Sequence, residues 1–455
     1  MPADKTKNYE NPHIMRIDNP LVTKHGMAPA YSVPVMKTID NAGVAELAGK
    51  YGSPLFVFSE KQIKSRFKKT LDAFRKNYPK VTFGWSYKTN YLKTICRLFH
   101  AEGAWAEVVS GFEYERARSL GVPGKRIIYN GPYKPYESLK LAVSEGARIH
   151  IDSTDEIGDL ERIAAELGTT PRVAIRIHMD TGIFPPWSRF GFNYENGQAR
   201  QAVERIRFKR RLSLEGLHTH IGTFILDKNA YRLAAKKMVA MMKVVEEVTG
   251  GGVSYIDLGG GFASMNWLRG IYQPPEISIP KIEDYAEAIT STLKEELSGR
   301  PLPELVLETG RYLIDEAGYL VTTVVASKLL PDARRAYVLD AGVNIMYTST
   351  WYRHKVFLES PEKSLPAPSA LMGPLCMNID VLDESIMLPR LPRGKHLIIH
   401  PAGAYNTTLW TQFSQYRPAV VLIRENGSVD LIRSRENLAD MDICEQLPKD
   451  LRCEK

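Results

Sequence analysis

Residues 82–90, with the sequence TFGWSYKTN, form a short β-rich run that ends near a lysine and is followed by an amphipathic helical stretch. The same alternation recurs up to residue 308. The predicted strands are Thr82–Lys88, Trp105–Ser110, Arg126–Asn130, Arg148–Asp152, Val173–Ile177, Leu214–Ile221, Ser254–Gly259 and Glu304–Glu308. Eight strand–helix units over roughly 230 residues match a (β/α)8 barrel in number and length. A doubly wound parallel sheet remains open, because alternation alone does not show that a sheet closes.

The pattern changes after about Leu313, where helical periodicity weakens and turns rich in Pro, Gly and Asn separate short β-rich runs. We therefore expect a mostly β second domain, with strands at Leu320–Leu329, Arg335–Asp340, His396–His400 and Val420–Arg424. We assign the α/β barrel to residues 51–313 and the β domain to residues 314–455, with residues 1–50 as an N-terminal segment that packs on the β domain. The segment Pro54–Ser59 precedes the first barrel strand and is a candidate extra strand of the β domain.

Composition narrows the function classes. The chain has 455 residues, of which 44% are hydrophobic and 25% charged, as in an ordinary globular protein. Its net charge of +8 is spread over the sequence, so we expect no nucleic-acid partner, although an anionic small molecule would be favoured. No run of about 18 apolar residues predicts a membrane span, and Met1–Glu10 is too polar for a signal peptide. The four cysteines form no C-x-x-C pair, which favours a reducing, cytoplasmic location.

The ends of barrel strands are the sharpest place to look for function, since active sites of such barrels lie at their carboxyl ends. The first predicted strand ends in Ser86-Tyr-Lys88-Thr-Asn90. A lysine inside an apolar strand is desolvated, which lowers the pKa of its amine and makes Lys88 a Schiff-base candidate. The competing interpretation is a rim lysine whose amine reaches solvent.

Two histidines end the sixth predicted strand, in the sequence LHTHIGT. Strand alternation puts His218 and His220 on one face, where they would form a metal pair, stack on a flat cofactor or pack in the core. A metal site would need a third histidine or an aspartate at neighbouring strand ends. Those ends supply Arg176, glycines and Glu308 instead, so we predict no metal.

The last two barrel strands end in DLGGGF and LETGR. Three glycines, Gly259, Gly260 and Gly261, allow backbone N–H groups to surround a phosphate, although they also suit a tight turn. Glu308 would hold a protonated ring nitrogen and Arg311 a phosphate, or the two would form an ion pair. A strand lysine, a stackable histidine, a glycine cradle and a carboxylate together compose a pyridoxal phosphate site.

The motifs SYKTN, HTHIGT, DLGGGF, LETGR, DAGVN, GPLC and AGAYN stand in the order found in one family. From about residue 51 to residue 433, the chain resembles the fold-type III pyridoxal-phosphate decarboxylases, the diaminopimelate/ornithine decarboxylase family. The resemblance implies a barrel of the alanine racemase type with a β second domain. It also implies a homodimer with active sites shared between the subunits.

The resemblance also implies roles for individual residues. Lys88 matches the catalytic lysine that binds the cofactor, and His220 the histidine that stacks on its ring. Thr223 occupies the place of a phosphate-binding serine, and Gly259, Gly260 and Gly261 match the phosphate-binding glycines. Glu308 matches the acid that keeps the pyridine nitrogen protonated.

Further matches extend the implied cofactor site. Arg311 matches an arginine near phosphate or substrate, and Glu107 replaces a family aspartate close to the cofactor. Arg176 is expected on the side of the cofactor's phenol oxygen. From the β domain, Tyr405 matches a cofactor-contacting tyrosine, and Cys376 of Gly-Pro-Leu-Cys matches a catalytic cysteine that reaches the partner subunit's site.

Departures from the family concern the substrate's far end. Met377 follows Cys376, where relatives have an acid, and Arg353 follows Tyr352, where diamine-forming relatives have an aspartate. Thr348-Ser349 stand where diaminopimelate enzymes have Arg-Pro. We therefore expect a substrate pocket with Arg311, Tyr352, Arg353 and Met377, and a substrate with an acidic or acylated distal end, presented on a carrier or as a siderophore-type intermediate.

The implied reaction is decarboxylation of an amino acid or amino-acid derivative, with Cys376 or Lys88 protonating Cα. Four alternatives stay open at this point. They are diaminopimelate decarboxylation itself, amino-acid racemisation on the same barrel, metal-dependent hydrolysis with His218 and His220, and a non-catalytic relative that binds a partner protein. For Cys376 itself, the competing interpretation is a small buried hydrophobic residue.

Overall fold

Eight parallel strands form a closed barrel in the computed structural model, which describes residues 33–451. Closure follows from the pairing of β10 with both β8 and β11, and this excludes the doubly wound sheet. The barrel strands, in the order in which they neighbour one another, are β4 (Val81–Ser86), β5 (Trp105–Val108), β6 (Ile127–Tyr129), β7 (Arg148–Ile151), β8 (Arg172–His178), β10 (Ser213–His218), β11 (Tyr255–Asp257) and β13 (Glu304–Leu307). A short strand, β9 (Phe192–Asn193), pairs in parallel with the end of β8 outside the ring.

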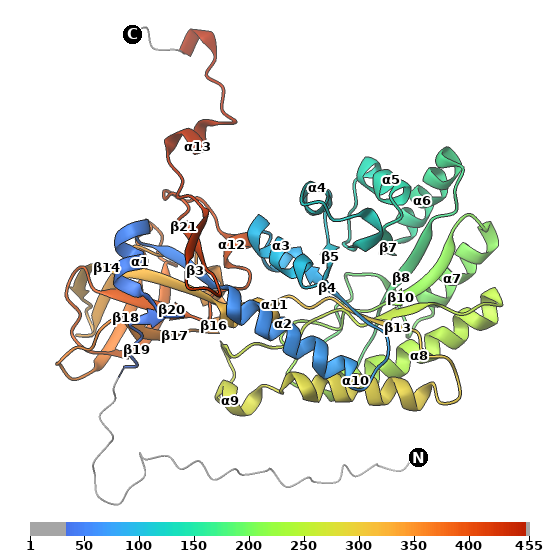
Figure 1. Cartoon of the computed structure of the whole chain (residues 1–455), viewed down its shortest axis with the longest axis horizontal. Helices are drawn as coiled ribbons and strands as arrows, with labels where there is room; N and C mark the ends of the chain where they lie inside the picture. Colours follow the sequence, from blue (N-terminus) through green and yellow to red (C-terminus); the bar gives the residue numbers. More distant parts are fainter. Residues whose placement is uncertain (1–32, 452–455) are drawn as a thin grey trace, which may run out of the picture.

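Helices surround the barrel strands (Figure 1). Three of them begin at serines, Ser59, Ser110 and Ser153, whose side chains accept hydrogen bonds from backbone N–H groups of the first helical turn. Their apolar faces point to the barrel, so the core lies between the helices and the strands. The helices are α2 (Glu60–Arg75), α3 (Lys93–Ala101), α4 (Gly111–Ser119), α5 (Tyr136–Ser144), α6 (Thr154–Leu167), α7 (Gln198–Lys209), α8 (Asn229–Thr249), α9 (Pro275–Ser278), α10 (Ile282–Glu296) and α11 (Arg311–Ile314).

The first barrel strand ends earlier than the sequence predicts. β4 stops at Ser86, and Lys88 lies in the 3-10 turn η2 (Tyr87–Thr89) that follows it. In the same way β10 stops at His218, so His220 lies in the loop beyond the strand. The residues that the sequence predicts as strand ends therefore lie in loops, and these loops form the face of the barrel at the carboxyl ends of its strands.

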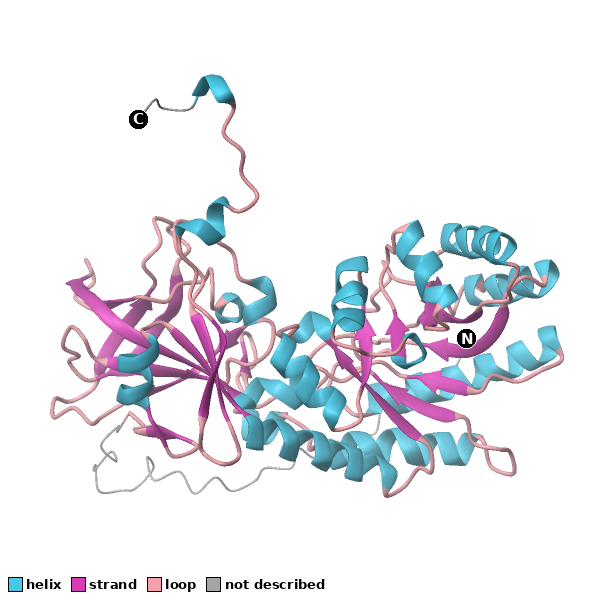
Figure 2. Ribbon diagram, turned by 45° about the horizontal axis from the view of Figure 1, so that its top comes forward, coloured by secondary structure: helices cyan, strands magenta, loops and turns pink. Residues whose placement is uncertain are grey.

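The second domain is built mainly from β-strands and stands beside the barrel (Figure 2). Its longest strand, β14 (Gly318–Leu329), pairs with three neighbours. One of them, β3 (Leu55–Ser59), comes from before the barrel and lies between β14 and β21, so the chain starts in this sheet, makes the barrel and returns. The other strands are β15 (Arg335–Leu339), β16 (Tyr352–Arg353), β17 (Lys355–Leu358), β18 (Ala367–Met372), β19 (Val381–Leu388), β20 (His396–His400), β21 (Ala419–Ile423) and β22 (Val429–Arg433).

The described part of the N-terminal segment packs against this sheet. Val44 and Leu47 of α1 (Val44–Tyr51) share a buried apolar cluster with Val57, Val321 and Ile398. Residues 1–32 of the predicted segment lie outside the described residues. Within residues 33–451, no helix is both long and apolar enough to cross a membrane. The remaining elements are β1 (Thr38–Ile39), β2 (Ala42–Gly43), β12 (Trp267–Leu268), α12 (Asn406–Leu409), α13 (Leu438–Asp442), η3 (Gly124–Arg126), η4 (Asp315–Ala317), η5 (Tyr347–Thr350) and η6 (Lys449–Leu451).

Candidate active site

A cavity of about 720 Å³ lies at the carboxyl ends of the barrel strands, between the barrel and the β domain. Barrel residues form its base, and residues 350–352 and 405 of the β domain form one wall. It brings together most of the predicted site residues. Those that line it are Lys88, Glu107, Arg176, His220, Thr223, Glu308, Arg311, Tyr352 and Tyr405.

Lys88 lies at the base of this cavity beside a buried carboxylate. Its Nζ is 2.6 Å from Oε2 of Glu107, and its backbone carbonyl accepts a hydrogen bond from Thr408 in the β domain. Burial lowers the pKa of Lys88, but the charges of Glu107 and Glu308 outweigh burial and raise it above its usual value. The expected lowering by desolvation is therefore wrong, because the sequence did not show that two carboxylates face the amine.

Glu308 is held from several sides in the barrel interior. Asn130 donates a hydrogen bond to Oε1, and Nε2 of His218 lies 3.3 Å from Oε2. Burial opposes ionisation, but His218 and other neighbouring groups hold the pKa of Glu308 well below its usual range. Burial and the charge of Glu308 raise the pKa of Asp257 well above the usual value of an aspartate. These opposite shifts favour the negative charge on Glu308 over Asp257, as suits an acid that stabilises a ring N–H⁺.

His220 presents a neutral ring to the cavity. Burial, with the charges of Lys88 and Arg176, lowers the pKa of His220 well below its usual value. The backbone N–H of Gly260 donates to Nδ1 at 3.2 Å, and Trp187 meets the ring edge-on with centroids 5.3 Å apart. These contacts fix a flat, uncharged ring that suits stacking.

The glycine loop after β11 has no room for side chains. A Cβ at Gly260 would lie 2.2 Å from the carbonyl oxygen of Glu308, and one at Gly261 would lie 2.4 Å from that of Gly222. Gly259 and Gly261 also have positive φ angles, +66° and +93°. The loop therefore packs directly against neighbouring backbone, and only glycine fits at these positions.

Arg311 lies between the glycine loop and the β domain. Its guanidinium is 4.6 Å from the ring of Tyr405 and 5.3 Å from that of Tyr352, and Nη2 donates to Oγ1 of Thr223 at 3.2 Å. Nε and Nη1 are buried and have no hydrogen-bond partner within the described residues. A buried guanidinium with unused donors next to a glycine loop and a hydroxyl matches an anion such as phosphate.

Tyr405 and Arg176 complete the predicted cofactor contacts. Tyr405 adopts a left-handed conformation with φ of +65°, and its N–H donates to the carbonyl of Thr89 at 2.8 Å, which ties the β domain to the lysine turn. Arg176 lies 3.6 Å from Asp152 and stacks on Phe190. The residues present fit pyridoxal phosphate, because a stacking ring, a charged acid, a lysine and a buried guanidinium line one cavity. The glycine loop lies outside that lining, and two of its N–H groups already donate, that of Gly259 to Asp257 and that of Gly260 to His220.

The predicted substrate residues divide into two groups. Tyr352 faces the cavity, but Arg353 is exposed and lies outside it, with its guanidinium 5.8 Å from the ring of Trp267. Adjacent residues in the strand β16 point to opposite faces. The expectation that Arg353 faces the substrate is therefore not met within one chain, whereas Arg269, which the sequence did not single out, lines the mouth.

Cys376 and Met377 lie in the loop between β18 and β19, away from the cavity of their own chain. Asp380 shapes this loop, since its carboxylate accepts the N–H groups of Leu375 and Val343 at 2.7 and 2.8 Å. Cys376 is exposed. A pre-shaped loop that presents an exposed cysteine is consistent with the expected reach into a partner subunit, which stays a prediction.

Several lining residues escaped the sequence interpretation. Asn130 ends the third predicted strand and bridges Glu107 and Glu308, so its place at a strand end was an available signal. Trp187 and Trp351 come from long loops without a recognisable pattern.

A buried cluster below the cavity qualifies the prediction of no metal. Ligand atoms of His150, His218, Asp257 and Glu308 all lie within 4.8 Å of one another. The sequence argument had looked for such partners at strand ends, yet it passed over Asp257 at the end of β11 and missed His150, which is inside the fourth strand. The metal alternative would therefore use His218 with these residues, and not the pair of His218 and His220.

Fold and site define a pyridoxal-phosphate-dependent enzyme, and comparisons with known proteins place it more closely. A family model described as "Pyridoxal-dependent decarboxylase, pyridoxal binding domain" matches residues 61–315. The chain is 31% identical over 411 residues to diaminopimelate decarboxylase of Aquifex aeolicus, covering 88% of this chain and 93% of that one. It is 32% identical over 418 residues to the enzyme of the same name from Methanothermobacter thermautotrophicus, covering 89% and 94%.

Solved structures agree with these relatives. The crystal structure of diaminopimelate decarboxylase from Methanocaldococcus jannaschii superposes with a TM-score of 0.83 at 29% identity, covering 93% of this chain and 99% of that one. The chain belongs to the pyridoxal-dependent decarboxylases of the diaminopimelate/ornithine decarboxylase family. It is a pyridoxal-phosphate-dependent carboxy-lyase that acts on an amino acid.

Proposed function

We propose that this decarboxylase acts on an amino acid with an acidic or acylated distal group. The observation that carries the proposal is the charge at the cavity mouth. Within the described residues, the lining carboxylates are Glu107 and Glu308, and both are engaged at the base. Arg269 also lines the cavity, and its Nε and Nη2 donate to the backbone carbonyls of Ser349 and Leu382. Its positive charge and its Nη1 would therefore meet a distal carboxylate or acyl oxygen, whereas the described lining offers no unengaged acid to a distal ammonium.

We assign the chemical roles as follows. Bound pyridoxal phosphate supplies a ring that takes up the electron pair left when carbon dioxide departs. Glu308 keeps the pyridine nitrogen protonated, and His220 supports the face of the ring. Lys88 holds the cofactor and moves a proton, and the glycine loop with Arg311 and Thr223 holds the phosphate.

The proton that replaces carbon dioxide on Cα needs a nearby acid. We propose Cys376 from the partner subunit or Lys88 for this step. Cys376 is exposed in its own chain, on the loop shaped by Asp380, which supports a homodimer with shared sites. Presentation of the substrate on a carrier or as a siderophore-type intermediate, and a cytoplasmic location, stay predictions.

Diaminopimelate is the second candidate substrate. The relatives that are 31% and 32% identical over nearly the whole chain carry that name. Diaminopimelate has a carboxylate at its distal end, which Arg269 would bind, but also an ammonium group for which the described cavity lining offers no unengaged acid.

Carbon dioxide release from the holoenzyme tests the proposal. The panel contains diaminopimelate, lysine, ornithine, 2-aminoadipate and N-acylated lysines. We expect acidic or acylated compounds to react fastest, and Arg269→Met to lower their kcat/KM about 10-fold, the effect of losing one charge-assisted hydrogen bond. Arg353→Met, outside the cavity, is the matched control and should change little. The proposal fails if lysine or ornithine is preferred, and diaminopimelate replaces it if that compound reacts fastest.

A further inference from the structure

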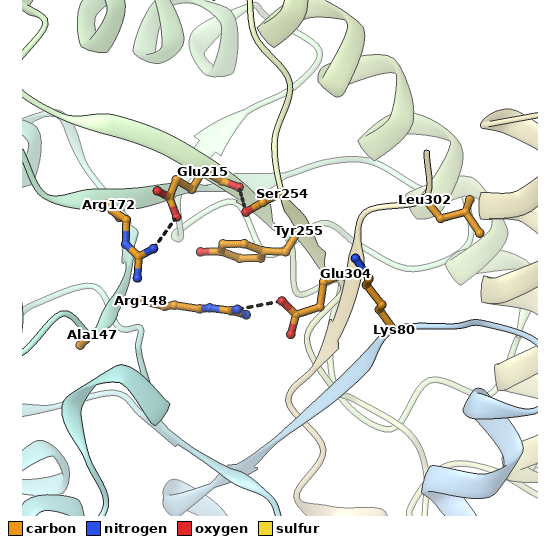
Figure 3. A pocket seen from close by; sticks show the side chains of 9 residues that line it. All are labelled: Lys80, Ala147, Arg148, Arg172, Glu215, Ser254, Tyr255, Leu302 and Glu304. Atoms are coloured by element: carbon orange, nitrogen blue, oxygen red, sulfur yellow. Dashed lines mark hydrogen bonds and ion pairs between the residues drawn. The ribbon is translucent and has the colours of Figure 1, made fainter. Parts of the chain in front are cut away.

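A second cavity, of about 300 Å³, lies at the opposite end of the barrel, where the strands begin (Figure 3). Side chains from the first residues of several strands surround it. The cations are Lys80, Arg148 and Arg172, and the anions are Glu215 and Glu304. This end of the barrel therefore combines a polar cavity with an excess of one positive charge, far along the strands from the predicted cofactor site.

Among the cations of this cavity, Arg148 makes the most contacts with described residues. Its guanidinium lies 4.3 Å from the ring of Trp105 and 4.6 Å from that of Tyr255, and Nη2 is 2.7 Å from Oε2 of Glu304. Nη1 is buried and has no hydrogen-bond partner in the described part of the chain. Leaving a buried donor unsatisfied is unfavourable, so this position favours an added acceptor.

The other two cations are available to a ligand. Lys80 is exposed and forms no ion pair with any described residue. Arg172 is only loosely paired, 3.6 Å from Glu215, and 59% of its side chain is exposed. Glu304 is already engaged by Arg148 and Thr82, which reduces its repulsion of an anion.

We propose that this cavity binds a small oxyanion, a carboxylate or phosphate, through Arg148, Arg172 and Lys80. A guanidinium fixed between two rings provides the directional contact, and the two outer side chains close over the ligand. The proposal adds a second binding site to the chain and does not depend on the substrate of the first.

A continuous polar column connects the two ends of the barrel. Tyr255 Oη is 3.1 Å from Nε2 of His150, the rings of His150 and His218 stack with centroids 4.6 Å apart, and His218 reaches Glu308. Gly216 makes room for the ring of Tyr255, because a Cβ at position 216 would lie 2.2 Å from that ring. Apolar side chains fill most such barrels. The column therefore couples the anion to Glu308, a consequence that rests on the cofactor role proposed for Glu308.

Calorimetric titration of the holoenzyme at constant ionic strength tests the site, with succinate and inorganic phosphate as separate probes. We expect saturable binding of one or both, and the tighter probe identifies the chemistry. Lys80→Met and Arg172→Met, both exposed positions, should each weaken binding about 3- to 10-fold. Lys363→Met, an exposed lysine of the β domain, is the matched control. Absence of saturable binding, or equal binding by the Lys80→Met/Arg172→Met double variant, would overturn the site.

The coupling has its own readout in the absorbance of the bound cofactor. Saturating anion should change the wild-type spectrum, and His150→Phe should bind the anion yet lose this change. A wild-type spectrum that does not respond to saturating anion would overturn the coupling. Both measurements are independent of carbon dioxide release, so they separate failure of this site from failure of the proposed substrate.

Discussion

Replacing Glu107 by glutamine should lower the pKa of Lys88. Oε2 of Glu107 is fully buried and lies 2.6 Å from Nζ of Lys88. Burial alone would lower the pKa of Lys88, whereas the charges of Glu107 and Glu308 raise it. Glutamine keeps the size of the side chain and removes only the charge, so the variant isolates the electrostatic contribution.

The size of the shift follows from the geometry. Two unit charges about 4 Å apart at an effective dielectric constant of about 20 attract by about 4 kcal/mol, or about 3 pKa units. A third of the Lys88 side chain is exposed to solvent, which weakens this attraction, and Glu308 remains. We expect the pKa of Lys88 to fall by about 1–2 units.

Cofactor loading into the apoenzyme reports this pKa, because only an unprotonated lysine amine attacks the aldehyde of pyridoxal phosphate. The loading rate should rise with pH as Lys88 loses its proton. Glu107→Gln should shift that profile to lower pH by about 1–2 units and load faster at neutral pH. Glu102→Gln, an exposed position, is the control. A folded Glu107→Gln variant that loads no faster at pH 7, or whose profile moves upward, refutes the reasoning.

Three further predictions concern the cradle, a buried acid and the dimer. Gly260→Ala, whose Cβ would lie 2.2 Å from a carbonyl oxygen, should weaken cofactor binding at least about 10-fold in fluorescence titrations, while Gly251→Ala, with open space around it, should not. Burial raises the pKa of Glu113 to about 7. The native state then binds more protons than the unfolded state between about pH 4.5 and 7, so stability falls as pH rises through this window. Glu113→Gln should flatten the fall and add about 1–3 kcal/mol at pH 8, measured by denaturant unfolding, and an unchanged slope would contradict this. Mixed Lys88→Ala and Cys376→Ala subunits should regain about a quarter of wild-type activity, and proven heterodimers without activity would exclude shared sites.

The barrel was predictable because the same strand–helix unit recurs along the sequence. Eight alternations of a β-rich run and a helical stretch leave few topologies, and closure is confirmed by one pairing, β10 with β8. The family motifs in the barrel stand at the carboxyl ends of the predicted strands, so they predicted that Lys88, His220 and Glu308 lie on one face of the barrel. Their convergence on one cavity follows from the parallel arrangement of the strands, which the alternation predicts.

What the sequence did not predict depends on side-chain direction and on partners distant in the chain. Arg353 lies in a two-residue strand that the sequence did not predict, so alternation could not be used to place it opposite Tyr352. The pKa of Lys88 depends on Glu107, nineteen residues further on. His150 lies inside an apolar run, IHI. Nothing in the neighbouring sequence distinguishes an ordinary core histidine from one that belongs to a polar column and stacks on His218. The position of Cys376 relative to a partner subunit is not encoded in one chain's fold.

We assign the cofactor of this decarboxylase to Lys88. Borohydride reduction of the holoenzyme followed by peptide mapping tests this assignment most directly, since reduction fixes the pyridoxyl group on the lysine that binds it. We predict the label on the peptide that contains Lys88, and its loss in Lys88→Ala with the fold retained. A pyridoxyl group on any other lysine, or reduction without a labelled peptide, would contradict the account.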